Sequence, residues 1–257
     1  IRINERVIMK QRHIQIIEMV SQRKKIEVNE LADILGATTA TIRRDLSFLS
    51  EKGILRRERG YALLNNPNDI NYRMAFGFEN KQKIARCAAK LVDDNETILL
   101  ENGSTCALFA QAVAAAHQNV SFITNSAYIA RYIKENSDAS VMLLGGKFIK
   151  DTQSVVGPLT KECVKAFHVD KIFVGIDGFS ERDGFTGTDI DRSDTIRAMA
   201  RSANHLFILA ESRKFLKPSP VGYFDFDPVY QVITDDQINP ETKALIEEKG
   251  IIVSVAK

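Results

Sequence analysis

The sequence of 257 residues has little cysteine, little histidine and no long apolar run. Its three cysteines, Cys87, Cys106 and Cys163, are far apart and odd in number, which argues against a disulfide framework and against a Cys-x-x-Cys metal site. The four histidines are also scattered, so no cluster of metal ligands is visible. We therefore expect no metal site and no cofactor.

Long apolar segments are missing as well. No run approaches the roughly 20 apolar residues needed to cross a bilayer. The polar, charged beginning of the sequence lacks the apolar core of a signal peptide. These absences predict a cytoplasmic protein without a membrane partner. With 44% hydrophobic and 26% charged residues, the chain is long enough for two globular domains with cores of their own.

Net charge is small for the whole chain, at +2, but it is unevenly distributed. Residues 1–64 contain 13 Lys and Arg against 8 Asp and Glu, a net of +5, whereas the remainder contains 22 against 25, a net of −3. A basic excess confined to one part of a chain is typical of a phosphate-binding module joined to a neutral or acidic domain. Residues 1–64 are therefore a candidate nucleic-acid-binding domain.

The segment 28–49 has the layout of a helix-turn-helix. Apolar residues recur at i, i+3, i+4 and i+7 over residues 28–35, which predicts a short helix with one buried face that Gly36 ends. Thr38 is placed to cap a second helix, in which apolar residues recur at i, i+4 and i+7 over residues 42–49. Two short amphipathic helices joined by a glycine turn are typical of DNA-binding heads.

The outward face of the second helix is the predicted recognition surface. Small residues at its N-terminal end allow a close approach to base edges, and two guanidinium groups supply forked donors for guanine or phosphate. A merely solvated surface would explain the two arginines equally well. Helical spacing over residues 12–21 adds the third helix that such a domain needs, and this favours DNA binding. The predicted DNA-binding residues of the helix are Thr38, Thr39, Ala40, Thr41, Arg43, Arg44 and Ser47.

A wing is predicted after the recognition helix. Gly53 ends that helix, and the segment GILRRERGYALL indicates a hairpin that turns at Gly60. Arg56, Arg57 and Arg59 cluster beside this turn. We expect these three arginines to contact the phosphate backbone or an adjacent minor groove and to contribute affinity more than base discrimination.

Domain boundaries follow from composition. We expect a winged helix-turn-helix domain over residues 1–64 and a linker over residues 65–79, because Asn65 to Arg73 is rich in turn formers and shows no apolar periodicity. An α/β domain is expected over residues 80–257, entered by a helix over residues 81–92.

The second domain alternates short apolar runs with helical patterns. This repetition predicts a Rossmann-like, largely parallel sheet covered on both faces. The expected strands are TILLE at 97–101, VSFIT at 120–124, SVMLLG at 140–145, KIFVGI at 171–176, HLFILA at 205–210, YQVIT at 230–234 and IIVSV at 251–255.

Polar residues and glycines gather where these strands end. The ligand of an open parallel sheet lies outside the carboxyl ends of the strands, so we expect these loops to converge on one crevice. Gly103, Ser104 and Thr105 resemble a phosphate cradle at a helix N-terminus, although such a triplet is also common in plain turns. Arg213 and Lys214 follow another strand, where a cation could close over the same anion.

Several motifs of the sequence resemble those of a known protein family. The run LADILGATTATIRRDLSFLSEKGILRR is similar to the N-terminal domain of the DeoR family of bacterial transcriptional repressors. The family continues its wing as Arg-x-His-Gly-Gly-Ala, whereas this chain has Arg-Glu-Arg-Gly-Tyr-Ala at 57–62. The similarity extends through the second domain, because the family's Gly-Ser-Thr, Thr-Asn-Ser, Gly-Gly, Gly-x-Asp-Gly, Gly-x-Thr and Leu-Ala-Asp-x-Ser-Lys-Phe motifs recur here in order or as close variants.

The resemblance implies a sensor domain similar in fold to sugar-phosphate isomerases, with a phosphorylated sugar or related metabolite as effector. It implies that the chain is a regulator, a repressor of carbohydrate-related genes, that binds double-stranded operator DNA and associates with the nucleoid when bound. The expected effector-binding residues are Asn102, Gly103, Ser104, Thr105, Thr124, Asn125, Ser126, Gly145, Gly146, Asp177, Gly178, Thr186 and Lys214.

Some positions depart from the family pattern. Asn102 stands where many members have an aspartate, Ile196 where many have a lysine, and Glu211 and Arg213 where aspartate and serine are usual. The neutral amide removes a charge that could bind sugar hydroxyls, and the isoleucine removes one potential phosphate contact. Effector preference is therefore expected to differ from that of other members.

Two alternatives to a ligand-controlled repressor stay open. One is a sugar-phosphate isomerase that carries a DNA-binding head, with Asp177 as the base that moves a proton between adjacent carbons. The other is a repressor with a vestigial pocket that responds to a partner protein. In a repressor of either kind, ligand-controlled or with a vestigial pocket, one helix-turn-helix domain reads only a short half-site of the operator. We therefore expect a homo-oligomer, either a dimer or a tetramer.

Overall fold

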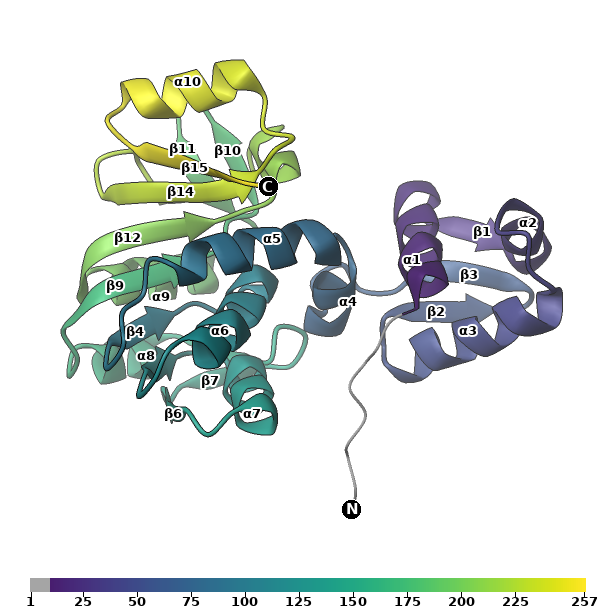
Figure 1. Ribbon diagram of the computed structural model, residues 1–257, viewed down its shortest axis with the longest axis horizontal. Helices are drawn as coiled ribbons and strands as arrows, with labels where there is room; N and C mark the ends of the chain where they lie inside the picture. Colours follow the sequence, from purple (N-terminus) through teal and green to yellow (C-terminus); the bar gives the residue numbers. More distant parts are fainter. Residues whose placement is uncertain (1–9) are drawn as a thin grey trace. The chain divides into compact units, whose positions relative to one another are not determined.

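The computed structural model describes residues 10–257, and contacts divide the chain into two compact units between Phe78 and Glu79. Within residues 10–78, the first unit contains four helices and a small antiparallel sheet (Figure 1). The helices are α1 (Gln11–Arg23), α2 (Val28–Ile34), α3 (Thr39–Glu51) and α4 (Ile70–Ala75). The sheet has the order β1-β3-β2, and its strands are β1 (Lys25–Glu27), β2 (Leu55–Glu58) and β3 (Tyr61–Leu64).

Helices α1, α2 and α3 form the predicted three-helix core. Their fully buried side chains include Ile17 of α1, Leu31 of α2 and Leu46 of α3. The Thr38 hydroxyl accepts a hydrogen bond from the backbone N–H of Thr41 at 3.2 Å, which confirms the predicted cap of the recognition helix α3. This cap satisfies one of the amides that the first turn of a helix leaves without a partner.

Strands β2 and β3 form the predicted wing. The two residues of its turn, Arg59 and Gly60, both have positive φ angles, of 38° and 86°. This conformation belongs to the type I′ turn, whose twist matches that of the flanking strands. Strand β1 was not expected, and it extends the wing by pairing with β3 in antiparallel fashion.

Residues 65–79 were expected to be a linker, and the structure shows a folded segment there. The Asp69 side chain caps helix α4 by accepting from the N–H of Asn71. Tyr72 and Ala75 of α4 are buried in the same cluster as the helix-turn-helix core, and the Tyr72 hydroxyl lies 2.7 Å from Ser21 Oγ. The prediction was wrong because a helix of six residues is too short to show apolar periodicity.

Helix α3 is also held to α1 by a buried carboxylate. Asp45 accepts hydrogen bonds from Arg12 Nε at 2.5 Å and from His13 Nε2 at 3.1 Å. Burial favours a higher pKa for Asp45, but the hydrogen bonds and charges of Arg12 and His13 outweigh it and lower the pKa below its usual value. The Asp45 contribution to stability is therefore complete above the pKa of the unfolded chain, near 4, and is lost as pH falls through the lower folded value.

The Asp45→Asn substitution should therefore flatten the acid side of the stability profile. At pH 7 we expect the variant to lose about 2 kcal/mol, in the range of hydrogen bonds to charged groups. Below about pH 4 the variant and the original chain should converge. Urea unfolding followed by circular dichroism between pH 3 and 7 measures this, with exposed Asp33→Asn as the control. Parallel pH profiles for Asp45→Asn and the original chain would contradict the assignment.

The second unit is built on a seven-stranded sheet of order β15-β14-β12-β9-β4-β5-β6, in which every neighbouring pair is parallel. All seven expected strands are confirmed, within a few residues at their ends. They are β4 (Thr97–Leu100), β5 (Ser121–Thr124), β6 (Ser140–Leu143), β9 (Val169–Val174), β12 (Ala203–Leu209), β14 (Val229–Asp235) and β15 (Ile252–Ala256).

Helices and two small sheets complete this unit. The helices are α5 (Phe78–Ala89), α6 (Ser104–Ala116), α7 (Ala127–Asn136), α8 (Pro158–Val164), α9 (Ile190–Ala200) and α10 (Pro240–Glu248), with a 3-10 turn η1 (Ser212–Phe215). The entry helix α5 begins and ends three residues earlier than expected. One small sheet contains β10 (Gly178–Ser180), β11 (Gly184–Gly187) and β13 (Val221–Phe224), and the other contains β7 (Lys147–Ile149) and β8 (Ser154–Val156).

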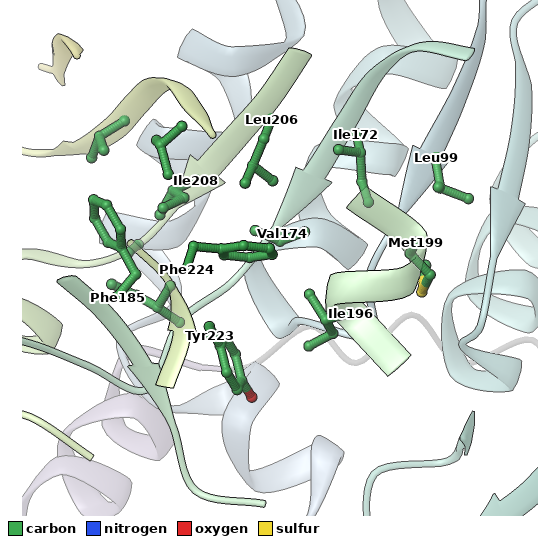
Figure 2. Packing of buried hydrophobic residues seen from close by; sticks show 14 of the residues in the cluster. Leu99, Ile172, Val174, Phe185, Ile196, Met199, Leu206, Ile208, Tyr223 and Phe224 are labelled. Atoms are coloured by element: carbon green, nitrogen blue, oxygen red, sulfur yellow. The ribbon is translucent and has the colours of Figure 1, made fainter. Parts of the chain in front are cut away.

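Both faces of the large sheet are covered, as its continuous apolar strands predict. On one face Ile172 and Val174 lie in the same cluster as Ile196 of α9, and Figure 2 shows this packing. On the other face the ring of Phe173 lies 4.2 Å, centroid to centroid, from Phe109 of α6. Within residues 10–257, no helix is long and apolar enough to cross a membrane.

Candidate DNA-binding and effector sites

The outer surface of α3 carries the predicted base-reading residues. Thr39, Ala40, Arg43 and Arg44 are exposed, while Ile42 on the opposite face is fully buried. The Arg44 guanidinium makes only a long contact, 3.5 Å, to the carbonyl of Ala40 in its own helix. The two arginines therefore stand on the solvent side of a helix that the core holds rigidly.

The recognition helix and the wing are joined by a hydrogen bond. Arg57 of the wing donates from Nη1 to Ser47 Oγ of α3 at 2.6 Å, and Ser47 donates in turn to the carbonyl of Arg43. Arg56 forms an exposed ion pair with Glu58 at 3.2 Å, and Arg59 lies in the turn of the wing. Ser47 and Arg57, both predicted to contact DNA, thus also contact each other, which sequence reasoning did not foresee.

The carboxyl ends of the sheet strands meet at a buried charge network. Glu101, directly after β4, is fully buried and accepts from the N–H of Gly175, after β9, at 3.2 Å. Arg192 of α9 donates to Glu101 Oε1 from Nε at 3.0 Å and from Nη2 at 2.8 Å. Its Nη1 lies 3.0 Å from Asp177 Oδ2, and Lys214 Nζ lies 3.4 Å from Asp177 Oδ1. Loops from β4, β9 and β12 therefore converge on one cluster.

The pKa of the buried guanidinium is raised in this network. Burial alone would lower the pKa of Arg192, but the nearby Tyr223, Glu101 and Asp177 stabilise its charged form and raise the pKa well above the usual value. Arg192 and Glu101 were not predicted. They lie 91 positions apart in the sequence, so no local pattern connects them, although a glutamate at the end of an apolar strand is itself an unusual feature.

Asn102 and Asp177 are brought together by Arg192, as the loop argument predicted. Asn102 Oδ1 accepts from Arg192 Nε at 3.3 Å, and its amide donates to Ser154 Oγ at 3.1 Å. Asp177 also accepts from the Thr188 hydroxyl at 3.2 Å. Both residues therefore already have hydrogen-bonding partners within the protein.

Gly103, Ser104 and Thr105 lie at the start of α6. Gly103 is its N-cap, and glycine has no side chain to cap the first-turn amides, whereas Ser126 caps α7 and Asp189 caps α9. A Cβ at position 103 would lie 2.9 Å from Glu101 Oε2, so the close approach to Glu101 requires glycine. Ser104 and Thr105 are both buried. The uncapped, partially positive helix end suits an anion.

Polar groups in the last residue of β5 and just after it divide into two kinds. The Thr124 hydroxyl donates to the carbonyl of Leu100, and the Ser126 hydroxyl accepts from the N–H of Ile129, so both support the fold. Asn125 is fully buried and donates to the carbonyl of Val155 at 3.1 Å. Its Oδ1 is a buried acceptor without a hydrogen-bond partner in the part of the chain that the structure describes.

The remaining predicted residues lie in supporting positions. A Cβ on Gly178 would come within 2.6 Å of the backbone of Lys217 and Ser219, and the Thr186 hydroxyl accepts from the N–H of Ser219 at 2.7 Å. Gly145 and Gly146 join β6 to β7, and a Cβ on Gly146 would meet Thr160 Oγ1. These four residues shape the loops around the network.

Lys81 is a further charged residue that sequence reasoning missed. It is 3% exposed, and its Nζ lies 3.5 Å from Oε2 of Glu211, just after β12. Arg213 binds the same carboxylate through two hydrogen bonds, of 2.8 and 3.2 Å. Burial favours a raised pKa for Glu211, but Lys81, Arg213 and Lys214 outweigh it and lower the pKa.

The first unit, with its exposed recognition helix and wing, and the second, with charged loops at the carboxyl edge of a parallel sheet, define a two-domain transcriptional regulator with a sensor. A model of the DeoR-like helix-turn-helix domain matches residues 12–68, and a model of the DeoR C terminal sensor domain matches residues 78–236. The chain belongs to the DeoR family, which confirms the resemblance read from its motifs.

Relatives match along almost the whole chain. The HTH-type transcriptional regulator GolR of Listeria innocua is 30% identical, over 96% of this chain and 98% of its own. The glycerol-3-phosphate regulon repressor of Escherichia coli is 28% identical, over 90% of this chain and 98% of its own. Among solved structures, ribose 5-phosphate isomerase A of Methanocaldococcus jannaschii is similar with a TM-score of 0.40 and 22% identity, over 53% of this chain and 54% of that one.

Proposed function

We propose that this regulator represses carbohydrate-related genes and that a phosphorylated sugar or related metabolite controls its binding to operator DNA. The exposed arginines of α3 and the basic wing supply the DNA-binding surface. The name of one relative, a repressor of a glycerol-3-phosphate regulon, supports control linked to a phosphorylated metabolite. The observation that carries the effector class is the uncapped first turn of α6, which lies beside the buried charge network.

The phosphoryl group is assigned to the start of α6. The backbone amides and hydroxyls of Ser104 and Thr105 would donate to its oxygens, and glycine at 103 keeps a capping side chain from competing. Lys214 would supply a cation, because its ammonium group is partly exposed at the same edge, beside Asp177. Charge-assisted hydrogen bonds of this kind are the strong ones in anion recognition.

Sugar hydroxyls are assigned to the facing strand ends. Asn125 Oδ1 is a buried acceptor that no group within residues 10–257 satisfies, and an unsatisfied buried acceptor is costly. A hydroxyl of the effector would donate to it. Asn102 and Asp177 remain predicted hydroxyl ligands, and they would have to exchange a partner in the network for the effector.

We propose no catalytic role for the effector site. The isomerase alternative needs Asp177 as a base, but both of its oxygens accept: Oδ2 from Arg192 and Thr188, and Oδ1 from Lys214. A carboxylate held by two cations is a poor proton acceptor, because the cations favour its charged form. The arrangement suits binding better than proton transfer.

A homo-oligomer, a dimer or a tetramer, is part of the proposal. One recognition helix reads only a short half-site, so specific binding in a genome requires at least two heads. Light scattering of the full chain at micromolar concentration tests this, and a strictly monomeric protein would contradict it.

A thermal-shift screen of sugar phosphates against the full chain tests the effector class. A ligand at 100 times its Kd should stabilise the folded chain by roughly 2.7 kcal/mol, which raises Tm by a few degrees. The matched unphosphorylated sugars should have no such effect. If no phosphorylated sugar shifts Tm, the proposal fails and a vestigial pocket that responds to a partner protein becomes the better interpretation.

A further inference from the structure

Lys81 occupies a position that helix α5 would ordinarily give to an apolar residue. The buried face of α5 contains Ile84, Ala85 and Ala88, and Lys81 continues the same stripe at the spacing i, i+3, i+4 and i+7. Its side chain is buried almost as completely as theirs. A lysine in such a position must keep its charge paired, and the pairing here is with Glu211 at 3.5 Å.

Glu211 connects Lys81 to the proposed effector site. Its carboxylate is 4% exposed, and the charge of Lys214 acts on it as well as those of Lys81 and Arg213. Lys214 in turn lies 3.4 Å from Asp177. Alternating charges therefore run from α5 through the loop after β12 to the loop after β9.

A buried ion pair of this kind contributes little net stability. The cost of taking two charges out of water is comparable with their attraction, and well-packed apolar residues of similar size often replace such pairs without loss. The pair is therefore better explained by an exchange of partners than by a contribution to stability. A buried lysine whose carboxylate partner can be displaced is a binding group for another anion.

We propose that Lys81 is a ligand of the effector's phosphoryl group, and that Glu211 is the internal anion that occupies Lys81 until the effector displaces it. The proposal rests on the function proposed above. The phosphoryl group would displace Glu211 from Lys81. Lys81 is the first buried residue of α5, so the binding partner of this helix would change. Helix α5 begins at Phe78, the last residue of the DNA-binding unit, so the exchange acts where the two units are joined in sequence. A ligand that binds the two arrangements of α5 unequally shifts their populations.

The inference is tested with inorganic phosphate as the probe, on the full chain. In Glu211→Gln the internal competitor is neutral, so we expect phosphate to bind about tenfold tighter by calorimetry. In Lys81→Met a charge-assisted contact is lost, so we expect binding about tenfold weaker or worse. Lys90→Met, an exposed lysine just after α5, is the control and should bind like the original chain.

A double variant guards against misfolding. Lys81→Met leaves Glu211 buried beside fewer cations, whereas Lys81→Met with Glu211→Met removes both charges and keeps the packing. We expect the double variant to fold and to bind phosphate as weakly as Lys81→Met. The sugar phosphate that stabilises the original chain should no longer change the affinity of the double variant for operator DNA.

The outcomes separate this inference from the proposed function. If neither phosphate nor any sugar phosphate binds the original chain, the proposed function fails, and the inference fails with it. If the original chain binds and responds, but Glu211→Gln does not bind phosphate more tightly or the double variant responds normally, the inference alone is wrong and Lys81 with Glu211 is a structural pair.

Discussion

Replacing Arg43 and Arg44 together with alanine should strongly weaken specific DNA binding while the fold stays intact. Both guanidinium groups are exposed on α3, and the buried face of the helix does not involve them. A good bidentate contact to a base contributes about 1–3 kcal/mol, so losing two should weaken binding by roughly 30-fold to 10⁴-fold. The measurement is the affinity for the operator sequence that the original chain selects from random DNA.

The control for this experiment removes the same charge elsewhere. Arg131 and Arg182 are exposed in the second unit, and their double alanine variant changes net charge equally. It should bind the operator almost normally. Circular dichroism checks that both double variants are folded. Unchanged operator affinity in the Arg43 and Arg44 variant would show that α3 does not dock in the major groove.

The wing provides a contrast within the first unit. Arg56→Ala and Arg59→Ala should lower affinity for all DNA sequences by similar factors and reduce the salt dependence of binding by about one counterion each. Arg57 is expected to behave differently, because it also holds Ser47 of the recognition helix. A loss confined to one base position for Arg56 or Arg59 would contradict a backbone contact.

Periodicity and apolar runs predicted most of the fold because these signals are local. Buried parallel strands are continuous apolar runs, and all seven were recognisable from such runs as KIFVGI. Strand β1 and helix α4 escaped, since three and six residues are too few for a period and their stability comes from partners distant in sequence. Tertiary packing decided both elements.

Loop position indicated the effector site, but long-range pairs define its chemistry. Asn102, Asp177 and Lys214 were placed at strand ends by topology alone. The structure joins Asn102 and Asp177 through Arg192, and Lys214 pairs with Asp177. Nothing in the segment around Arg192 indicated that its guanidinium is buried against Glu101. Lys81 could have been found, because a charged residue on an otherwise apolar helical stripe is a visible exception.

Loss of effector control without loss of DNA binding is the result expected for Ser104→Ala and Lys214→Met. Each substitution removes a proposed donor to the phosphoryl group, and hydrogen bonds to charged groups are worth about 1.5–3 kcal/mol, so effector affinity should fall roughly 10- to 150-fold. Neither residue belongs to the DNA-binding unit. Operator affinity without effector should therefore equal that of the original chain.

Folding should survive both changes. Asp177 keeps Arg192 and Thr188 as partners when Lys214 is replaced, and alanine at 104 is a strong helix former at the start of α6. Ser140→Ala and Lys165→Met, both exposed in the second unit, are the matched controls and should respond to effector normally. Titration of DNA binding against effector concentration measures the response for all four variants.

The DNA-binding state in which these unresponsive variants remain shows whether the effector releases the repressor from the operator or promotes its binding. Because binding can shift an equilibrium only through unequal affinity for its two states, a repressor released by effector should become a permanent repressor when Ser104 or Lys214 is lost. A repressor that needs its effector should instead lose repression. Normal response in both variants would mean that the phosphoryl group binds elsewhere, and that the uncapped end of α6 is a structural feature of the turn after β4.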